Sequence, residues 1–166
     1  MAHQYYVTVT GTTQNTFKAE SKKEGRKDKW MECIAFKMGS NVPYDANTGE
    51  AKGRRQHKPL TITKEWGAAS PQFLQAHWTN EVLTEVIIEV IGRTADGKQE
   101  RVLERITLSD AVVVSVDRYT GGEHAKEATE HTTDHLEDLG LRYRKIMVEN
   151  PVAGTSTSDD WVVASS

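Results

Sequence analysis

The sequence lacks the features that mark a disulfide-stabilised or membrane-spanning protein. Cys33 is the only cysteine among 166 residues, so no disulfide can form within one chain. Most of the residues around it in WMECIAF are apolar, and we expect a small buried side chain rather than a reactive thiol. No apolar run approaches the roughly 18 residues that span a bilayer. The opening segment MAHQYYVTVTG lacks the basic and apolar regions of a secretory signal, so we expect neither membrane insertion nor a cleaved signal peptide.

The charge argues against a nucleic-acid-binding protein, and the lack of catalytic and nucleotide-binding motifs argues against an enzyme. The net charge is −3 and the isoelectric point about 6.1, which gives no general attraction to nucleic acid. The basic runs KKEGRK and KGRRQHK have acidic neighbours and no aromatic stacking platform, so we expect solvated or partner-facing loops. G-x-S-x-G, Walker and G-x-G-x-x-G motifs are all missing. We therefore expect a protein that is not an enzyme and uses no cofactor.

A histidine-rich segment offers one alternative with catalytic chemistry. The motif HTTDH places His131 and His135 at metal-ligand spacing on a helix, and His124 lies close by in the sequence. The segment lacks an apolar face that would hold ligands rigidly, so a solvated loop is the favoured interpretation. A histidine-dependent metalloenzyme using the 124–135 cluster remains the alternative.

Strand signals dominate the rest of the chain. Leu60 and Ile62 alternate with Thr61 and Thr63, which predicts a strand with the aliphatic side chains inward. Asp96-Gly97 predicts a hairpin turn. About eight strands are expected in total: 5–12, 30–38, 59–66, 84–93, 100–108, 111–119, 139–150 and 160–165. Their regular spacing favours a mainly β fold, a small antiparallel β-barrel of two packed sheets.

One short flanking α-helix is predicted beside this barrel. Ser70 is the expected N-cap and Pro71 the first helical residue. Three- and four-residue spacing predicts an apolar face made of Phe73, Leu74, His77 and Trp78. Large aromatic side chains usually bury most of their area, so we expect four tryptophans in the core: Trp30, Trp66, Trp78 and Trp161.

Long loops and two-sided strands distinguish this chain from a simple barrel. We expect a single domain, 1–166, with long loops at about 11–28, 39–58 and 119–140; loops of this length often carry function. The strands at 30–38 and 86–91 are apolar on both faces, whereas a barrel needs only its inner face apolar. Their outer faces are therefore expected to meet the helix or another subunit.

The order of these segments resembles one known family. The stretch HKPLTITKEWGAASPQFLQAH, residues 57–77, is similar to the signature region of the haemolysin-coregulated protein (Hcp) family, the tube protein of type VI secretion systems. The similarity continues through DKWMECIAFKMG at 28–39, VIIEVIGRTADGKQERVLERITLSDAVVVSVD at 86–117, LRYRKIMVEN at 141–150 and DDWVVAS at 159–165. The order and spacing of these segments, rather than any single motif, make the resemblance specific.

The resemblance implies a structural subunit of the type VI secretion tube. Six copies would form a ring, and rings would stack into a tube that delivers effectors, some of them carried in its lumen. The implied partners are further copies of the chain and the spike, sheath and effector proteins of the system, with no nucleic acid. The implied location is the bacterial cytoplasm before firing, and then the extracellular medium or target cell, without a signal peptide.

The loop at 39–58 would join one ring to the next. The residues expected to make that contact are Tyr44, Asp45, Lys52, Arg54, Arg55 and His57. We expect polar side chains to line the pore, such as Thr61 and Thr63. One alternative of another class is a monomeric ligand-binding β-barrel with a closed apolar cavity, although the apolar outer strand faces count against it. A phage tail-tube subunit shares the tube architecture, and genomic context would separate it.

Overall fold

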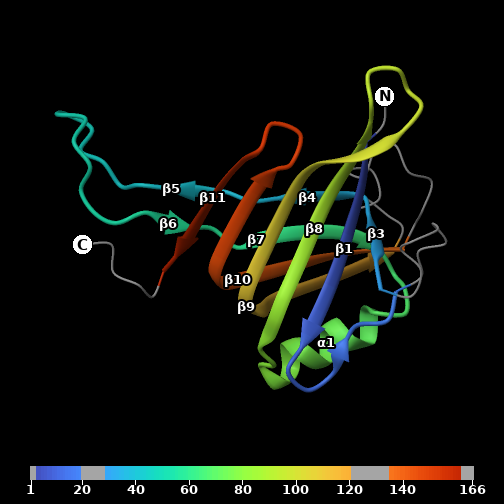
Figure 1. Ribbon diagram of the computed structural model, residues 1–166. Coiled ribbons are helices and arrows are strands. Elements are labelled where there is room, and N and C mark those ends of the chain that lie inside the picture. The colour runs from blue at the N-terminus through green and yellow to red at the C-terminus, as the bar shows by residue number, and fades with distance from the viewer. Residues whose placement is uncertain (1–2, 20–28, 121–134, 162–166) are drawn as a thin grey trace.

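Strands dominate the computed structural model, which describes residues 3–19, 29–120 and 135–161 (Figure 1). The predicted mainly β, antiparallel fold with one short flanking helix is confirmed for these residues. The elements are β1 (Gln4–Gly11), β2 (Asn15–Thr16), β3 (Met31–Cys33), β4 (Ala35–Lys37), β5 (Ser40–Asn41), β6 (Gln56–His57), β7 (Leu60–Glu65), α1 (Ser70–Thr79), β8 (Leu83–Arg93), β9 (Glu100–Thr120), β10 (His135–Asn150) and β11 (Thr155–Asp160).

The main sheet of the described residues follows the order β2-β1-β8-β9-β10-β7-β4, with β11 paired to β10 and β3 paired to β1. Because β3 pairs with β1 and β4 pairs with β7, the segment 31–37 joins the two ends of this order. We predicted one strand over 30–38, and the structure divides it at Ile34, whose N–H donates to the Thr63 carbonyl at 2.9 Å. Because of this break, β3 can pair with β1 and β4 can pair with β7.

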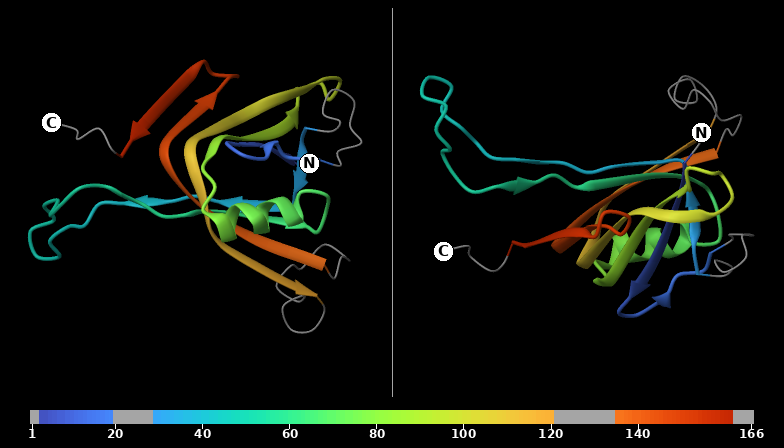
Figure 2. Two further views of the ribbon diagram at one scale, coloured as in Figure 1. Left: turned by 90° about the horizontal axis from the view of Figure 1, so that it is seen from below. Right: turned by 45° about the horizontal axis from the view of Figure 1, so that its top comes forward.

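The long strands β9 and β10 bend sharply where the main sheet curves (Figure 2). We predicted two strands at 100–108 and 111–119, but β9 runs without interruption through both. Asp110 adopts a left-handed conformation with φ 52°, and the β9–β10 register shifts between Gly140 and Leu141. Such irregularities bend a strand without ending it. A Cβ at Gly140 would lie 2.2 Å from Ser115 Oγ, so a glycine suits this close approach.

The core lies between the curved sheet and α1. Leu60 and Ile62 are buried, as predicted, and burial of each stabilises the fold by roughly 1.5–3 kcal/mol. Phe73 of α1 is buried against Phe17, with ring centroids 5.1 Å apart. Cys33 packs against this core, and burial raises the pKa of its thiol to about 12. The helix thus covers the lower end of the strands in Figure 1.

The helix begins one residue earlier than predicted. Ala69 is the N-cap, so Ser70 and Pro71 are the first and second helical residues. The Ser70 hydroxyl does not cap the helix; it donates to Glu137 Oε1 at 2.7 Å. The apolar face was also predicted incorrectly in part, because Ala76 rather than Trp78 is buried.

The tryptophan prediction is wrong for two of the four side chains. Trp78 is 74% exposed and Trp66 37% exposed, while Trp30 and Trp161 are half-buried. Trp78 lies at the last turn of α1, beyond the face that meets the sheet. Trp66 follows the end of β7, where its Nε1 donates to the Leu136 carbonyl at 2.9 Å. Both positions lie at the ends of elements, where an indole can remain partly in solvent.

The expected loops contain more regular structure than predicted. Two short strands, β5 and β6, lie within 39–58, and β2 lies within 11–28. Because β9 ends at Thr120 and β10 begins at His135, both ends of the 119–140 segment are strand. The last described strand, β11, ends at Asp160, the first residue of the predicted 160–165 strand, most of which lies outside the described residues.

A buried carboxylate holds the turn after β1. Glu81 Oε2 accepts hydrogen bonds from the N–H groups of Thr13 at 3.3 Å and Gln14 at 3.1 Å. The residue is 6% exposed. A Cβ at Gly11 would lie 2.0 Å from the same oxygen, so the absence of a side chain at Gly11 lets the carboxylate reach the turn.

Candidate functional site

The segment 39–58, called here the arm, is a hairpin that extends away from the main sheet (Figures 1 and 2). Ser40 pairs with His57 and Asn41 with Gln56, and these strands form a separate two-stranded sheet. Further along, the Lys52 N–H donates to the Pro43 carbonyl at 2.7 Å. A two-stranded hairpin is marginally stable in isolation. Contacts at its base are therefore expected to decide where it points.

Local hydrogen bonds shape the tip of the arm. Asp45 Oδ1 accepts from the N–H groups of Asn47 at 2.8 Å and Thr48 at 3.4 Å. Gly49 supplies the left-handed conformation that reverses the chain, with φ 74°. The Asn47 N–H, together with the Lys52 ammonium 3.3 Å from Asp45 Oδ2, lowers the pKa of Asp45. The tip is thus a turn held in shape by hydrogen bonds and an ion pair to Asp45.

The distal half of the arm is open to solvent. Tyr44 is 70% exposed and Val42 44% exposed, and Arg54 is also exposed. Apolar side chains on a projecting hairpin provide area that a partner can bury. Of the six residues predicted to join rings, the structure brings Tyr44, Asp45 and Lys52 together near the tip.

Of the other three predicted residues, Arg54 is exposed, while Arg55 and His57 turn back toward the body of the protein. Arg55 Nε lies 2.5 Å from Asp159 Oδ2, and Arg55 Nη2 lies 2.6 Å from Asp159 Oδ1. This is the two-pronged geometry that makes arginine–carboxylate pairs strong. Arg55 Nη2 also donates to the Asp160 carbonyl at 3.2 Å. The arm is thereby tied to β11.

His57 adds a second attachment on the same carboxylate. Its Nε2 lies 2.6 Å from Asp159 Oδ2 and its Nδ1 lies 3.0 Å from the Tyr143 hydroxyl. The imidazole also packs against Trp161, with ring centroids 5.1 Å apart. Arg55 and then His57 lower the pKa of Asp159 to about 2. We call Arg55, His57, Tyr143, Asp159 and Trp161 the anchor.

A neighbouring network holds the end of β11. Arg144 lies 3.3 Å from both Asp110 Oδ2 and Asp160 Oδ2, and its carbonyl accepts from the Trp161 N–H at 3.0 Å. The Arg142 guanidinium lies over the Trp161 ring, 5.5 Å from its centroid. The strand that carries Asp159 is therefore fixed to β10.

Sequence reasoning missed three members of the anchor: Tyr143, Asp159 and Trp161. They are distant in sequence from the arm, and nothing in a single sequence pairs them with it. The one local signal is the two-residue spacing of Arg55 and His57, which puts both side chains on one side of an extended segment. That spacing indicates a shared partner but does not identify it.

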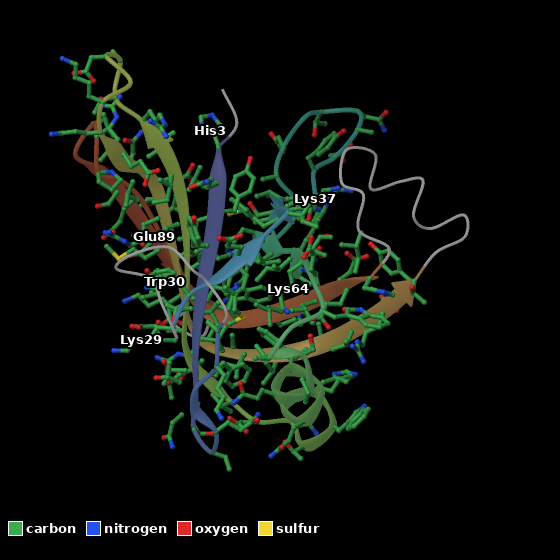
Figure 3. The ribbon with its side chains drawn as sticks, turned by 90° about the vertical axis from the view of Figure 1, so that its right-hand side faces the viewer. His3, Lys29, Trp30, Lys37, Lys64 and Glu89 are labelled. Atoms are coloured by element: carbon green, nitrogen blue, oxygen red, sulfur yellow. The ribbon has the colours of Figure 1, made fainter. Side chains whose placement is uncertain are left out.

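A second polar cluster joins α1 to the sheet and is structural. Lys64 Nζ lies 2.7 Å from Glu137 Oε1, and Arg118 Nε lies 3.5 Å from Glu137 Oε2. Both Lys64 and Glu137 are buried. Figure 3 shows Lys64 above α1, beside the strands. Since Ser70 at the start of the helix also bonds Glu137, this cluster positions the helix.

The described end of the histidine segment gives no support for a metal site. His124 and His131 lie outside the described residues. His135 begins β10, where its ring stacks on Trp66 with centroids 4.9 Å apart and its Nδ1 lies 2.8 Å from Thr120 Oγ1. Within 3–19, 29–120 and 135–161, no group of three or more His, Cys, Asp or Glu side chains could hold a metal ion.

The part of the chain that the structure describes has hollows on its surface. One, of about 350 Å³, is lined by residues that include Lys18, Glu32 and Lys64. Another, of about 290 Å³, includes His3, Tyr5 and Cys33. Their mixed polar lining differs from the closed apolar cavity expected of a ligand-binding barrel.

The one helix of the described residues is too short and too polar to cross a membrane.

Similarity to known proteins extends over almost the whole chain. Residues 6–149 match the family described as "Type VI secretion system effector, Hcp". The "Major exported protein" of Pseudomonas aeruginosa is 35% identical over 170 residues, covering 97% of this chain and 96% of its own length.

Solved structures of Hcp proteins have a fold similar to that of this chain. Secreted protein Hcp3 from Pseudomonas aeruginosa is 32% identical, with a TM-score of 0.77 and coverage of 96% of this chain and 99% of that one. The Hcp1 protein from E. coli EAEC 042 pathovar, solved as a double mutant, is 26% identical, with a TM-score of 0.82 and the same two coverages.

Proposed function

This chain belongs to the Hcp family of type VI secretion proteins, and on that premise we propose that it is a structural subunit of the secretion tube. Six copies close a ring, and rings stack into a tube that delivers effectors. The role is mechanical and steric, with no catalytic step. The observation that carries the proposal is the arm, a self-paired hairpin with an exposed tip and an anchored base.

Ring closure requires two different surfaces on each subunit that fit one another. Exposed apolar side chains on the body of the protein supply area for such contacts, namely Trp78, Val82 and Val114. Burial of such area between copies would favour association at roughly 25 cal/mol per Å² before the entropic cost of association. These side chains support the ring part of the proposal.

The arm makes the contact between rings. Tyr44 and Val42 bring exposed apolar area to the tip, while Asp45, Lys52 and Arg54 bring charges. The β5–β6 sheet has two strands, so each has an outer edge free of sheet pairing within the described residues. Such edges readily pair with another chain. A neighbouring copy in the next ring is the partner that a repeating tube provides.

The lumen is lined by polar side chains, with Thr61 and Thr63 as candidates. Thr61 and Thr63 alternate with the buried Leu60 and Ile62, so they lie on the face of β7 away from the core. Thr63 Oγ1 donates to Asp138 Oδ1 of β10 at 2.7 Å, which makes this face polar across two strands. A polar wall suits effector proteins that pass through in water.

The further partners in this proposal are the spike, the sheath and the effectors of the secretion system. The protein is made in the bacterial cytoplasm and leaves the cell when the system fires. Its relative in Pseudomonas aeruginosa carries the name major exported protein, which supports the second step.

Electron microscopy of the concentrated, purified protein tests the proposal. We expect six-fold rings in end-on views and stacks of rings in side views. A variant in which residues 42–53 are replaced by a short turn should keep the rings and lose the stacks. Particles without a ring, at every concentration, would contradict the proposal. A monomer that retains a small molecule would instead favour a ligand-binding barrel.

A further inference from the structure

We propose that Asp159 is the positioning residue that fixes the direction in which the arm leaves the body of the protein. One carboxylate on β11 receives Arg55 at both of its oxygens and His57 at one of them. The inference rests on the proposed function only where ring stacking is the readout. The direction of the arm itself can be measured without it.

The arm needs such a residue because its own pairing does not determine its direction. Its strands pair with each other in a sheet separate from the main one. At its base, the Lys58 N–H donates to the Gly39 carbonyl at 2.9 Å, a bond that closes the hairpin without linking it to the body. A hairpin joined to a domain through two adjacent chain segments can swing as a unit about that junction.

The anchor opposes this motion on one face of the arm. Arg55 lies immediately before β6 and His57 ends it, and both side chains reach the same carboxylate, so they project from one face of the arm. That face turns toward β11 and the end of β10, where Asp159, Tyr143 and Trp161 meet it. His57 is largely enclosed, with a side chain 9% exposed. The contacts therefore fix the orientation of the arm relative to β11, as well as its distance from β11.

Asp159 is the member whose loss affects both attachments. Arg55 and His57 Nε2 are donors to its oxygens, and both oxygens are used. Asparagine keeps the size of the side chain but replaces one acceptor oxygen with an NH₂ donor. At one of the two positions of the former carboxylate oxygens, the N–H groups of Arg55 or His57 would then face the NH₂ group of asparagine instead of an acceptor. Asp159→Asn should release the arm while leaving β11 paired to β10.

The chain offers a matched control in Asp110→Asn. Asp110 lies in the same polar region and pairs with Arg144 at 3.3 Å, but its side chain makes no contact with the arm among the described ion pairs. Its φ of 52° is a conformation that asparagine also tolerates. The substitution removes the same charge from the same surface and leaves Asp159 in place.

Pulsed electron paramagnetic resonance measures the direction of the arm. Spin labels are attached at Ala46→Cys, on the exposed tip, and at Gln75→Cys, on an exposed position of α1. Cys33 is half-buried and lines a surface hollow, so Cys33→Ser is introduced into every labelled chain. Labelled chains are diluted with unlabelled ones, so that each distance comes from one chain. The parent protein should give one narrow distance distribution.

Asp159→Asn should lose the narrow peak, and Arg55→Gln should lose it as well. Asp110→Asn should keep it. The proposal is overturned if Asp159→Asn retains the narrow distribution, or if Asp110→Asn broadens it equally. Circular dichroism of each variant checks that the strands have formed, and Arg55→Gln keeps the test decisive should Asp159→Asn fail to fold.

Electron microscopy then connects the anchor to assembly. Asp159→Asn should still form rings but give few stacks, whereas Asp110→Asn should stack as the parent does. If the parent forms no rings, the proposed function fails while the distance measurement still decides the role of Asp159. If rings of Asp159→Asn stack normally, a released arm is sufficient for stacking, and the link between anchor and assembly is wrong.

Discussion

Lys64 and Glu137 form a buried ion pair, 2.7 Å apart, that joins β7 to β10 next to the first turn of α1. Ser70 Oγ donates to the same Glu137 oxygen, so the helix start and two strands meet at one carboxylate. Buried charges are tolerated when each has its partner, and removal of one partner leaves the other uncompensated. The pair therefore makes the position of the helix sensitive to single substitutions.

Lys64→Met should destabilise the fold by about 3–5 kcal/mol, because Glu137 would remain buried and lose its closest cation. The double variant Lys64→Met/Glu137→Met should recover much of this loss. Chemical denaturation at one fixed protein concentration measures both. Lys98→Met, at an exposed lysine in the β8–β9 turn, is the control and should change little. A loss as small as that of the control would show that the pair is unimportant.

Gly11→Ala should cost about 1–3 kcal/mol, because the new methyl group would displace the Glu81 carboxylate from two backbone N–H groups. Gly53→Ala is the matched control. A Cβ there would meet only Pro43 Cγ, at 3.9 Å. Thermal unfolding of the two variants should separate them clearly. Equal melting temperatures would mean that the carboxylate adapts to the methyl group without loss.

The contribution of the anchor to stability should disappear in acid. The pKa of Asp159 is lowered from 3.8 to about 2, so the folded state favours the ionised carboxylate. Its stabilising effect is complete above about pH 4 and is lost as the pH falls toward 2. The difference in stability between the parent and Asp159→Asn, measured at each pH, should be constant from pH 7 to pH 5 and vanish near pH 2. A difference that already fades near pH 6 would assign the effect to another group.

Tyr44→Ala should abolish stacking and leave the ring intact, since Tyr44 lies on the arm tip with 70% of its surface exposed. Sedimentation velocity distinguishes single rings from stacks. Val152→Ala, at an apolar residue 50% exposed in the turn between β10 and β11, is the control and should stack normally. Stacks formed by Tyr44→Ala would remove this side chain from the proposed contact.

Cys33 should resist thiol reagents in the folded protein at neutral pH, because burial raises its pKa to about 12 and leaves almost no thiolate. Reaction with a chromogenic disulfide should begin only when denaturant unfolds the chain. Rapid reaction of the folded protein would show that the segment around β3 opens readily.

The parts of the fold that depend on neighbours in sequence could be predicted. The alternation of Leu60 and Ile62 with threonines identified β7 and its buried face. Asp96-Gly97 identified the β8–β9 turn, where Gly97 has φ 71° and the Thr94 N–H donates to the Gln99 carbonyl at 2.8 Å. Each of these signals acts over a few residues, so composition and spacing are sufficient to detect it.

The parts that depend on distant partners could not be predicted. Arg55 and His57 were proposed as inter-ring residues, and their contact with Asp159, about a hundred positions away, was not predicted. The break at Ile34 follows from pairing with both β1 and β7, which a local pattern does not reveal. The exposure of Trp78 depends on which face of α1 meets the sheet.

The native mass of the purified protein tests the central claim most directly. Light scattering behind a sizing column, at a dilution at which rings do not stack, should give six times the chain mass of 18.6 kDa. Asp159→Asn and Tyr44→Ala should give the same value, since both substitutions concern the arm and not ring closure. A mass equal to one chain at every concentration would contradict a protein that forms rings by itself.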